Sequence, residues 1–340
     1  MNLIFTNENA IKYECGYTCD NAVLLMLGGE KTFITDSRYE SDAKEKLNNT
    51  KLLITRDLLG VAIEELNSSK IKTLEYNPHE LSAYQYQAIK SKTDIDLIAK
   101  NGLSQKRRII KSYTELEYLQ ESIDLNAKAF NTFAKFIKTY LNNNKILSEK
   151  ELFFHAKNIL SYNGKYDLSF DPITAIKENS ALPHAHPTHI EYSTDDILLF
   201  DAGIKYKGYC SDRTRTTSIN NDMNFDKYNQ KFKDSLEQKV YDTVLKAQEN
   251  AMKVATVGAK ASDIDKAARD TIDKAGFGKY FIHSTGHGVG LDIHELPVIS
   301  TNSDTIIEEN MAFTIEPGIY LPKENGKKSF GVRIEDIVIT

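Results

Sequence analysis

The sequence lacks any long apolar run, which excludes one class of protein at the outset. No stretch approaches the roughly 18 consecutive apolar residues that a membrane-spanning helix needs, and the mean hydropathy is -0.43. The first residues, MNLIFTNENAIKYECGY, also lack the basic segment followed by an apolar core that marks a secretory signal. We therefore expect neither a membrane partner nor secretion.

Cysteine and strong charge are scarce as well. Cys15, Cys19 and Cys210 are too few for a cysteine zinc site, and their odd number offers no disulfide framework. We therefore expect free thiols and a cytoplasmic protein. The formal net charge is -5 and the isoelectric point is near 6.0, so the composition indicates no nucleic-acid partner.

The length predicts two domains, because 340 residues exceed one ordinary hydrophobic core. Residues 1–110 read as a small α/β domain, and residues 111–340 as a larger second domain. A segment rich in lysine and arginine at 106–111 marks the boundary between them. The strand-like runs of the first domain lie at 22–27, 31–35, 52–55 and 72–75.

The second domain runs twice through one order of elements. Two amphipathic helices come first, and capping boxes predict their starts at Thr114 with Glu117 and at Ser148 with Glu151. Strand-like segments follow. A long helix over residues 225–254, a shorter helix and further strand-like segments then repeat the order.

Equal spacing supports this repeat. The second short helix is expected to begin at Ser262, which lies 114 positions after Ser148. Glu316 follows Asp201 by 115 positions, and each acid ends an apolar run. We therefore expect a pseudo-twofold α+β domain with helices outside, a sheet inside and a site between the halves.

Five ionisable residues of this domain form a candidate metal site. An acid at the end of an apolar strand is costly to bury unless it is neutralised, and clustered carboxylates raise one another's pKa. Two divalent cations would balance four carboxylates, and oxygen-rich ligation with a single imidazole suits Mn²⁺, with Co²⁺, Fe²⁺ or Zn²⁺ as alternatives. Each acid alone fits an ordinary salt bridge, but their matching places in the two halves favour a joint site. The five are Asp201, Asp212, His287, Glu316 and Glu335.

Several short stretches, taken together, carry a resemblance to a known family. They are Asp201-Ala202-Gly203, Ser211-Asp212-Arg213-Thr214-Arg215-Thr216, His283-Ser284-Thr285-Gly286-His287-Gly288-Val289-Gly290, His294-Glu295, Glu316-Pro317-Gly318-Ile319-Tyr320 and Val332-Arg333-Ile334-Glu335-Asp336. In order and type they resemble the creatinase/aminopeptidase family, especially its Xaa-Pro aminopeptidase and Xaa-Pro dipeptidase (prolidase) branch. Thr35-Asp36-Ser37-Arg38-Tyr39 is similar to that family's N-terminal domain. The resemblance implies a "pita-bread" catalytic domain preceded by a smaller creatinase-type α/β domain.

The resemblance also implies a role for each matching residue. The five candidate ligands would bind two divalent metal ions, with Asp212 and Glu335 bridging both, and Glu316 would also take part in catalysis. His184 would lie near the bound substrate. The family more often has glycine after this histidine, where this chain has Ala185-His186; order and spacing favour His184 over His186.

Three further positions match family residues around the substrate. His294 would hold the scissile carbonyl or its oxyanion, His283 would line the proline side of the pocket, and Arg333 would lie beside the metals. An imidazole that binds no metal can donate a hydrogen bond to charge that develops in the transition state.

The sequence therefore predicts an Xaa-Pro aminopeptidase, a metal-dependent hydrolase that removes the first residue from peptides with proline in second place. An Xaa-Pro dipeptidase is the alternative, and sequence pattern does not separate the two. A methionine aminopeptidase would share the five ligands but would lack this first domain and the sequence motifs around Glu316 and Arg333. A non-catalytic binding protein of this fold would have lost ligands. The resemblance further implies a homodimer.

Overall fold

The computed structural model describes residues 1–323 and 328–340. By its internal contacts the chain divides into two compact units, Met1–Arg108 and Ile109–Thr340. Among the described residues, no helix combines the length and apolar character that a membrane crossing requires.

The first unit is built on a mixed sheet of six strands in the order β4-β3-β2-β1-β5-β6. β2 pairs antiparallel with β1 and β3, and the outer pairs are parallel. The four predicted strands are confirmed to within one residue at each end, whereas β1 and β6 are absent from the sequence prediction. The strands are β1 (Leu3–Phe5), β2 (Ala22–Leu27), β3 (Glu30–Thr35), β4 (Lys51–Ile54), β5 (Thr73–Tyr76) and β6 (Asp96–Ala99).

Alternating side chains give this sheet two hydrophobic faces. Ile4, Val23 and Leu25 pack in one cluster with residues of α3 and α4. Leu24 and Phe33 pack on the other face with residues of α1 and α2. Helices thus cover both faces, as expected for an α/β unit. The helices are α1 (Glu8–Cys15), α2 (Glu40–Lys46), α3 (Leu58–Ser68), α4 (Ala83–Lys92) and α5 (Leu103–Arg108).

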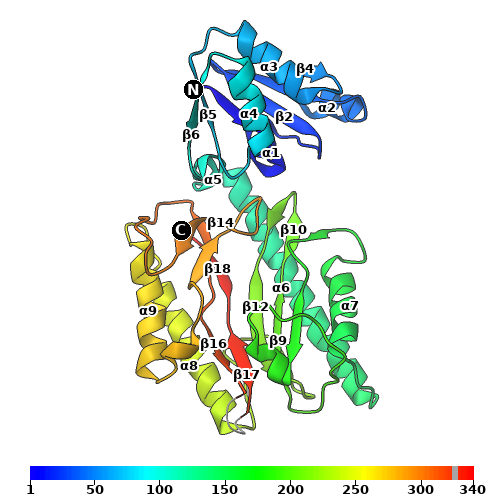
Figure 1. Cartoon of the computed structure of the whole chain (residues 1–340). Coiled ribbons are helices and arrows are strands. Elements are labelled where there is room, and N and C mark those ends of the chain that lie inside the picture. The colour runs from blue at the N-terminus through cyan, green and yellow to red at the C-terminus, as the bar shows by residue number, and fades with distance from the viewer. Residues whose placement is uncertain (324–327) are drawn as a thin grey trace. The chain divides into compact units, whose positions relative to one another are not determined.

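The second unit places two pairs of helices outside its strands. Figure 1 shows α6 and α7 on one side and α8 and α9 on the other, with the strands between them. The order predicted from the sequence therefore recurs in space. The helices are α6 (Tyr113–Asn142), α7 (Glu149–Leu160), α8 (Ser235–Val254) and α9 (Ala261–Lys274), with the short 3₁₀ helices η1 (Lys177–Ala181) and η2 (Gly278–Tyr280).

Two predicted helix starts need correction. The capping box of α6 is Ser112 with Glu115, not Thr114 with Glu117, because Ser112 has the extended backbone of an N-cap and Thr114 already lies within the helix. Residues 225–234 are not helical, and α8 begins after the N-cap Asp234. The predicted capping box at the start of α7 is confirmed.

The strands of the second unit form small antiparallel sheets. Their orders are β11-β10-β7, β12-β9-β8, β14-β13-β15-β18 and β16-β17. A turn joins β10 to β11, where Lys207 and Gly208 both have positive φ, at 54° and 93°. The strands are β7 (Asp167–Leu168), β8 (Ile173–Ile176), β9 (Ile197–Ala202), β10 (Ile204–Tyr206), β11 (Tyr209–Cys210), β12 (Arg213–Ser218), β13 (Gly286–Gly288), β14 (Glu295–Ile299), β15 (Ala312–Ile315), β16 (Gly318–Leu321), β17 (Phe330–Arg333) and β18 (Asp336–Ile339).

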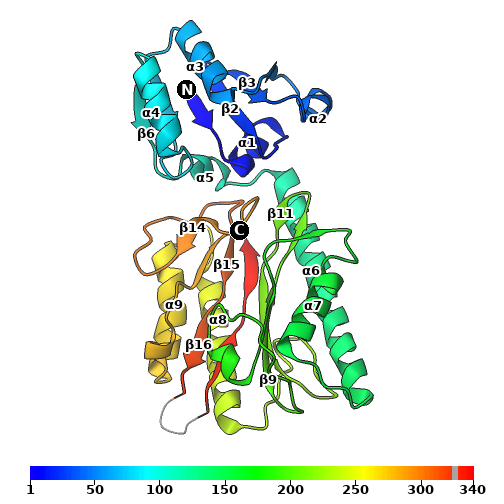
Figure 2. The same ribbon diagram turned by 45° about the vertical axis from the view of Figure 1, so that its right-hand side comes forward.

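Each half has its own core. Phe130 and Phe133 of α6 pack against Phe200 of β9, with ring centroids 4.5 Å apart in both pairs. In the other half, α8 and α9 pack against β15 through residues such as Val244 and Phe313. The two sets of strands lie next to each other along the middle of the unit (Figure 2), which leaves the ends of β9, β12, β15 and β17 facing a common region.

Candidate metal centre and substrate pocket

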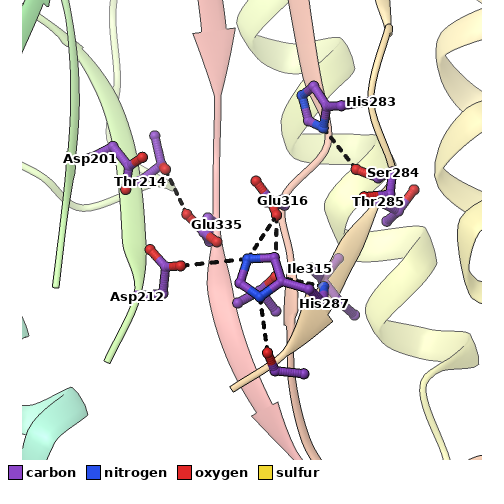
Figure 3. A network of polar contacts seen from close by, with 12 residues as sticks. Asp201, Asp212, Thr214, His283, Ser284, Thr285, His287, Ile315, Glu316 and Glu335 are labelled. Carbon is purple, nitrogen blue, oxygen red and sulfur yellow. Dashed lines mark hydrogen bonds and ion pairs between the residues drawn. The ribbon is translucent and has the colours of Figure 1, made fainter. Parts of the chain in front are cut away.

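The five candidate ligands come from the ends of paired strands and from one short strand. Asp201 lies near the end of β9, and its antiparallel partner in the register is Thr214 of β12. Asp212 directly precedes β12, and Glu316 directly follows β15. Glu335 lies between β17 and β18, and His287 lies within β13. Strand pairing therefore delivers residues from both halves to one place (Figure 3).

The donor atoms of this cluster lie close together. His287 Nε2 is 3.3 Å from Glu316 Oε1 and 3.6 Å from Asp212 Oδ2. Asp212, His287 and Glu335 each offer one ligand atom within 4.8 Å of the other two. Asp201 joins the group through Arg333, whose Nη2 donates to Asp201 Oδ2 at 2.6 Å.

Burial makes this cluster electrostatically unfavourable without cations. Asp201, Asp212 and Glu335 are 7%, 7% and 2% exposed. Burial raises the pKa of all three carboxyls, and neighbouring carboxylates raise it further. Arg333 opposes the rise but carries only one positive charge. The cluster therefore has more negative charge than its protein neighbours can neutralise.

Carboxylate oxygens without hydrogen-bond partners indicate which kind of ligand the cluster could bind. Within residues 1–323 and 328–340, Asp201 Oδ1, Asp212 Oδ1 and Glu335 Oε1 are buried and have no hydrogen-bond partner. A buried carboxylate oxygen without a partner is strongly disfavoured. Oxygen-rich sites of this kind suit hard divalent cations. The residues present therefore fit the metal ions that the sequence predicts.

The imidazole of His287 is oriented by its second nitrogen. His287 Nδ1 lies 3.0 Å from the carbonyl oxygen of Gly288, and a carbonyl can only accept, so Nδ1 is the donor. Nε2 is left to face Asp212 and Glu316. Such a hydrogen bond fixes the orientation and basicity of a ligating histidine.

Glu316 differs from the other acids. Burial alone would raise the pKa of its carboxyl, but the hydrogen bond and charge of His287 outweigh burial and lower it. Thr314 Oγ1 also donates to Glu316 Oε1 at 3.4 Å. Glu316 is therefore held ionised beside His287.

Close approach of strands explains two glycines of the histidine stretch. A Cβ on Gly286 would lie 1.9 Å from the carbonyl oxygen of Thr314. A Cβ on Gly288 would lie 2.1 Å from the carbonyl oxygen of Leu296, at a bulge in the β13–β14 pairing. Any other residue would push β13, and with it His287, away from the neighbouring strands.

Arg333 joins the acids to the substrate side of the site. Its Nε donates to Thr214 Oγ1 at 3.0 Å, and its Nη1 donates to Tyr320 Oη at 2.8 Å and to the carbonyl oxygen of Pro183 at 3.0 Å. Thr214 in turn donates to Glu335 Oε2 at 2.7 Å. Four of the five N–H donors of the guanidinium are thus used within the protein.

Tyr320 is a site residue that sequence reasoning missed. His283 Nδ1 donates to the carbonyl oxygen of Ser284 at 2.7 Å, so His283 Nε2 accepts from the Tyr320 hydroxyl at 3.0 Å. Burial raises the pKa of Tyr320 to about 12, which keeps it protonated. Its place in the stretch that begins with Glu316 is the signal that could have singled it out.

A pocket of about 520 Å³ opens on the cluster. His184, His283, His294 and Arg333 line it together with the five candidate ligands, so the structure brings all nine predicted site residues to one cavity. His186 lines it too. The remaining wall is largely apolar and includes Phe153, Phe170, Ile173, Pro183, Ala185, Pro187 and Ile293.

His294 lies at the pocket beside His287, with ring centroids 4.4 Å apart. Burial lowers the pKa of His294, and the neighbouring His287 lowers it further. Its imidazole is therefore neutral near pH 7 and retains one N–H to donate. In the described part of the chain, the His294 ring makes no hydrogen bond to the protein, so this donor is available to a ligand.

Both units match known protein families. The family model for metallopeptidase family M24 matches residues 117–340, and the model for the creatinase/prolidase N-terminal domain matches residues 2–110. Among curated relatives, the Xaa-Pro dipeptidase of Pyrococcus horikoshii is 30% identical over 339 residues, which cover 99% of this chain and 89% of that protein.

Solved structures agree with the family matches. The Xaa-Pro dipeptidase from Bacillus anthracis is 32% identical with a TM-score of 0.88, and the match covers 100% of this chain and 90% of that one. The X-Pro aminopeptidase from Thermotoga maritima is 30% identical with a TM-score of 0.84, covering 99% and 92% of the two chains. The likeness extends over both units.

Proposed function

Since the chain belongs to metallopeptidase family M24, it is a peptidase, and we propose that it is an Xaa-Pro dipeptidase. The predicted family and fold, a pita-bread catalytic domain preceded by a creatinase-type domain, are confirmed. The observation that carries the proposal is the buried acid cluster, which has unpaired carboxylate oxygens and lines a pocket whose remaining wall is largely apolar.

The five clustered residues are proposed to hold two divalent metal ions, with Mn²⁺ as the first choice. Such ions, when bound, supply Lewis acidity and lower the pKa of a water molecule. Four carboxylates balance the charge of two divalent ions, and the Arg333 guanidinium then leaves one positive charge in excess. An anionic nucleophile or the tetrahedral oxyanion of peptide hydrolysis would offset that excess.

The residues around the cluster suit the steps of peptide hydrolysis. Glu316, held ionised by His287, would accept a proton from the attacking water and pass it to the prolyl nitrogen as the bond breaks. His294, whose N–H faces the pocket, would donate to the oxygen of the scissile carbonyl as negative charge develops. His184, which also lines the pocket, would orient the substrate.

Proline recognition follows from what the bond before proline lacks. That amide has no N–H, so a site cannot select it through a hydrogen-bond acceptor and must recognise the ring. Apolar side chains such as Phe170, Ile173 and Ile293 line the pocket. His283, whose pKa burial lowers and whose ring is oriented by its bonds to Ser284 and Tyr320, would form one side of the proline subsite.

The choice between dipeptidase and aminopeptidase departs from the leading sequence prediction. The sequence alone placed Xaa-Pro aminopeptidase first, whereas relatives that cover nearly the whole chain carry the name Xaa-Pro dipeptidase. The aminopeptidase is kept as second candidate because the match to the Thermotoga maritima protein is nearly as close. The two activities differ in whether a free carboxylate follows the proline.

Histidines are the groups in the pocket that could bind the free carboxylate of a dipeptide. Arg333 is the only arginine or lysine among the described lining residues, and four of the five N–H donors of its guanidinium already bond protein groups. His184 and His186 line the pocket, and in the described part of the chain their rings make no hydrogen bonds to the protein. The carboxylate of a dipeptide would therefore accept hydrogen bonds from imidazole N–H groups.

Hydrolysis of matched substrates tests the proposal. We expect Xaa-Pro dipeptides to be cleaved with a kcat/KM at least about tenfold above that of Xaa-Pro-Ala tripeptides, because a charged carboxylate that is hydrogen-bonded contributes roughly 1.5–3 kcal/mol. Xaa-Ala dipeptides are the control for proline. Equal or faster cleavage of the tripeptides would move the assignment to the aminopeptidase, and indifference to proline would overturn both.

The cellular setting stays a proposal of the same kind. We propose that the chain acts as a homodimer in the cytoplasm. Light scattering on the purified protein would measure its oligomeric state. Fractionation of cells that express the protein would show whether it is cytoplasmic.

A further inference from the structure

A fully buried carboxylate lies outside the metal cluster and is used by none of the steps above. Glu149 is 0% exposed and is the first residue of α7. Over residues 1–323 and 328–340 it forms no ion pair with lysine, arginine or histidine. Burying an anion without a cation is costly unless several donors point at it, so its hydrogen bonds are informative.

Both oxygens of Glu149 bind the two ends of one loop. Oε1 accepts from the backbone N–H of Ile176 at 2.8 Å and from Asn179 Nδ2 at 2.9 Å. Oε2 accepts from the backbone N–H of Thr188 at 2.8 Å and from Thr188 Oγ1 at 2.5 Å. A single side chain therefore ties residue 176 to residue 188, and the segment between them becomes a closed loop.

The position of Glu149 suits this task. It directly follows the N-cap Ser148, where the positive end of the α7 dipole favours a negative charge. Backbone bonds run from the N–H of Glu149 to the carbonyl of Ile190 at 3.0 Å and from the N–H of Lys150 to the carbonyl of Thr188 at 3.1 Å. These bonds do not involve the carboxylate, so they can hold α7 in place if the carboxylate is changed.

The loop that Glu149 closes carries one wall of the substrate pocket. Pro183, His184, Ala185, His186 and Pro187 all line the pocket and all lie between the two tied ends. The tie also reaches the middle of the loop, because Asn179 Nδ2, which bonds Glu149, donates to the carbonyl oxygen of His186 at 3.0 Å. The backbone is thus fixed close to the histidines that face the substrate.

We infer that Glu149 is a positioning residue that holds the loop of residues 177–188 against the pocket and so sets the affinity for substrate. The inference rests on the proposed function in taking that substrate to be an Xaa-Pro peptide. Glu149 does not line the pocket, and its carboxylate makes no hydrogen bond to the metal cluster or to a lining residue among the described residues, so it acts through the placement of His184 and His186. Closing the loop orders these two rings before the substrate arrives, which lowers the entropic cost of binding.

The test replaces the carboxylate with an amide of the same shape. In Glu149→Gln, an NH₂ group must face the donors of Asn179 or Thr188. We expect KM for an Xaa-Pro dipeptide to rise by about tenfold, the effect of losing one hydrogen bond to a charged group, with a smaller change in kcat. Hydrogen exchange measured by mass spectrometry should accelerate in residues 177–188, while the rest of the second unit stays protected.

Glu151→Gln is the matched control. Glu151 lies two residues along the same helix, and within the described part of the chain its carboxylate bonds only Ser148, in the capping box. Glu151→Gln should therefore leave both the KM for the dipeptide and hydrogen exchange in residues 177–188 unchanged. If Glu149→Gln behaves like this control, or if exchange rises throughout the second unit instead of in the loop, the inference is overturned.

Thr188→Val keeps the inference testable if Glu149→Gln fails to fold. It removes one donor to the carboxylate and leaves α7 intact, so exchange should rise in the loop and KM should rise to a smaller extent; no change in either would also overturn the inference. The exchange measurement needs no substrate. An inactive wild-type protein would therefore contradict the proposed function, and the exchange in the loop would still decide the role of Glu149.

Discussion

The role of each histidine in the pocket depends on what its second nitrogen contacts. In His287 and His283, one ring nitrogen donates to the backbone carbonyl of the next residue, which fixes the tautomer. Their other nitrogens face the acids and Tyr320, respectively. His294 has no such partner among the described residues, so its N–H is free to serve a substrate.

These differences predict separate consequences for two neighbouring histidines. His287→Ala removes a donor from the acid cluster, so bound metal and activity should both fall. His294→Ala should leave the bound metal unchanged and lower kcat by about 10²–10³, the typical cost of losing one donor to a developing oxyanion. Metal content and kcat, measured on both purified variants, check the prediction.

The two variants also control for each other, since the rings are in contact. Metal lost from His294→Ala but retained in His287→Ala would mean that the two roles are reversed. A fall in kcat of less than about threefold in His294→Ala, well below the usual range for such a donor, would remove His294 from the reaction.

The sequence predicts the acids of this site better than their polar partners. Asp201 and Glu316 can be selected because each ends an apolar run, where a charge needs an explanation. The bonds from Thr214 to Glu335 and from Arg333 to Asp201 join residues more than 100 positions apart. Pattern within a segment carries no information about such pairs, so Thr214 and Tyr320 have no role in the sequence prediction.

At the scale of elements, the strand β12 joins the two halves of the second unit. Thr216 Oγ1 donates to the carbonyl oxygen of Arg333 at 3.0 Å and accepts from its N–H at 3.2 Å. Arg215 Nη1 donates to the carbonyl oxygen of Glu335. β12 therefore fixes the backbone of the segment that carries two residues of the site.

Thr216→Val should weaken the contact between β12 and the segment that carries Arg333 and Glu335. The change keeps the shape of the side chain but removes both hydroxyl bonds from a buried position, so we expect a loss of about 1–3 kcal/mol in the free energy of unfolding. Denaturant titration measures the loss. Metal affinity should fall with it, because Arg333 bonds Asp201 directly.

Thr217→Val is the control in the same strand. Thr217 is similarly buried, but its hydroxyl makes only a 3.5 Å contact among the described residues, with the carbonyl oxygen of Ser218, which is a weak bond by its length. An equal loss of stability in both variants would mean that β12 does not join the halves through Thr216.

Element boundaries fail in the sequence prediction where local side chains compete with the helix. Residues 225–234 have the apolar spacing of a helix, but Asn224 and Asp226 accept from the backbone N–H groups of Asp226 and Tyr228. These bonds favour turns over helix. The strand β1 is only three residues long, too short for alternation to stand out. Length does not explain the failure to predict β6, because β6 is as long as the predicted strands β4 and β5.

At the scale of the molecule, the candidate site exists only when both halves of the second unit are packed. Asp201 and Asp212 come from the first half, and His287, Glu316 and Glu335 come from the second. The repeated order of elements predicts this arrangement, since equal spacing places matching acids at matching strand ends. Loops such as residues 177–188, which contribute to the pocket wall, follow a course that no repeat predicts.

Assembly of the site from two halves has a consequence for stability. A metal that binds the packed cluster and not the unfolded chain stabilises the fold by mass action. The metal-free protein must instead bury carboxyls whose pKa values are raised. Bound metal should therefore stabilise the second unit as well as permit catalysis.

The central claim is that the buried acid cluster binds divalent metal and that this metal is required for cleavage of Xaa-Pro peptides. The most direct measurement removes metal with a chelator and then titrates Mn²⁺ back, following bound metal per chain and hydrolysis of an Xaa-Pro dipeptide together. The account predicts no hydrolysis without metal and full activity as bound metal approaches about two ions per chain, the number that four carboxylates balance. Undiminished hydrolysis by the metal-free protein would contradict it.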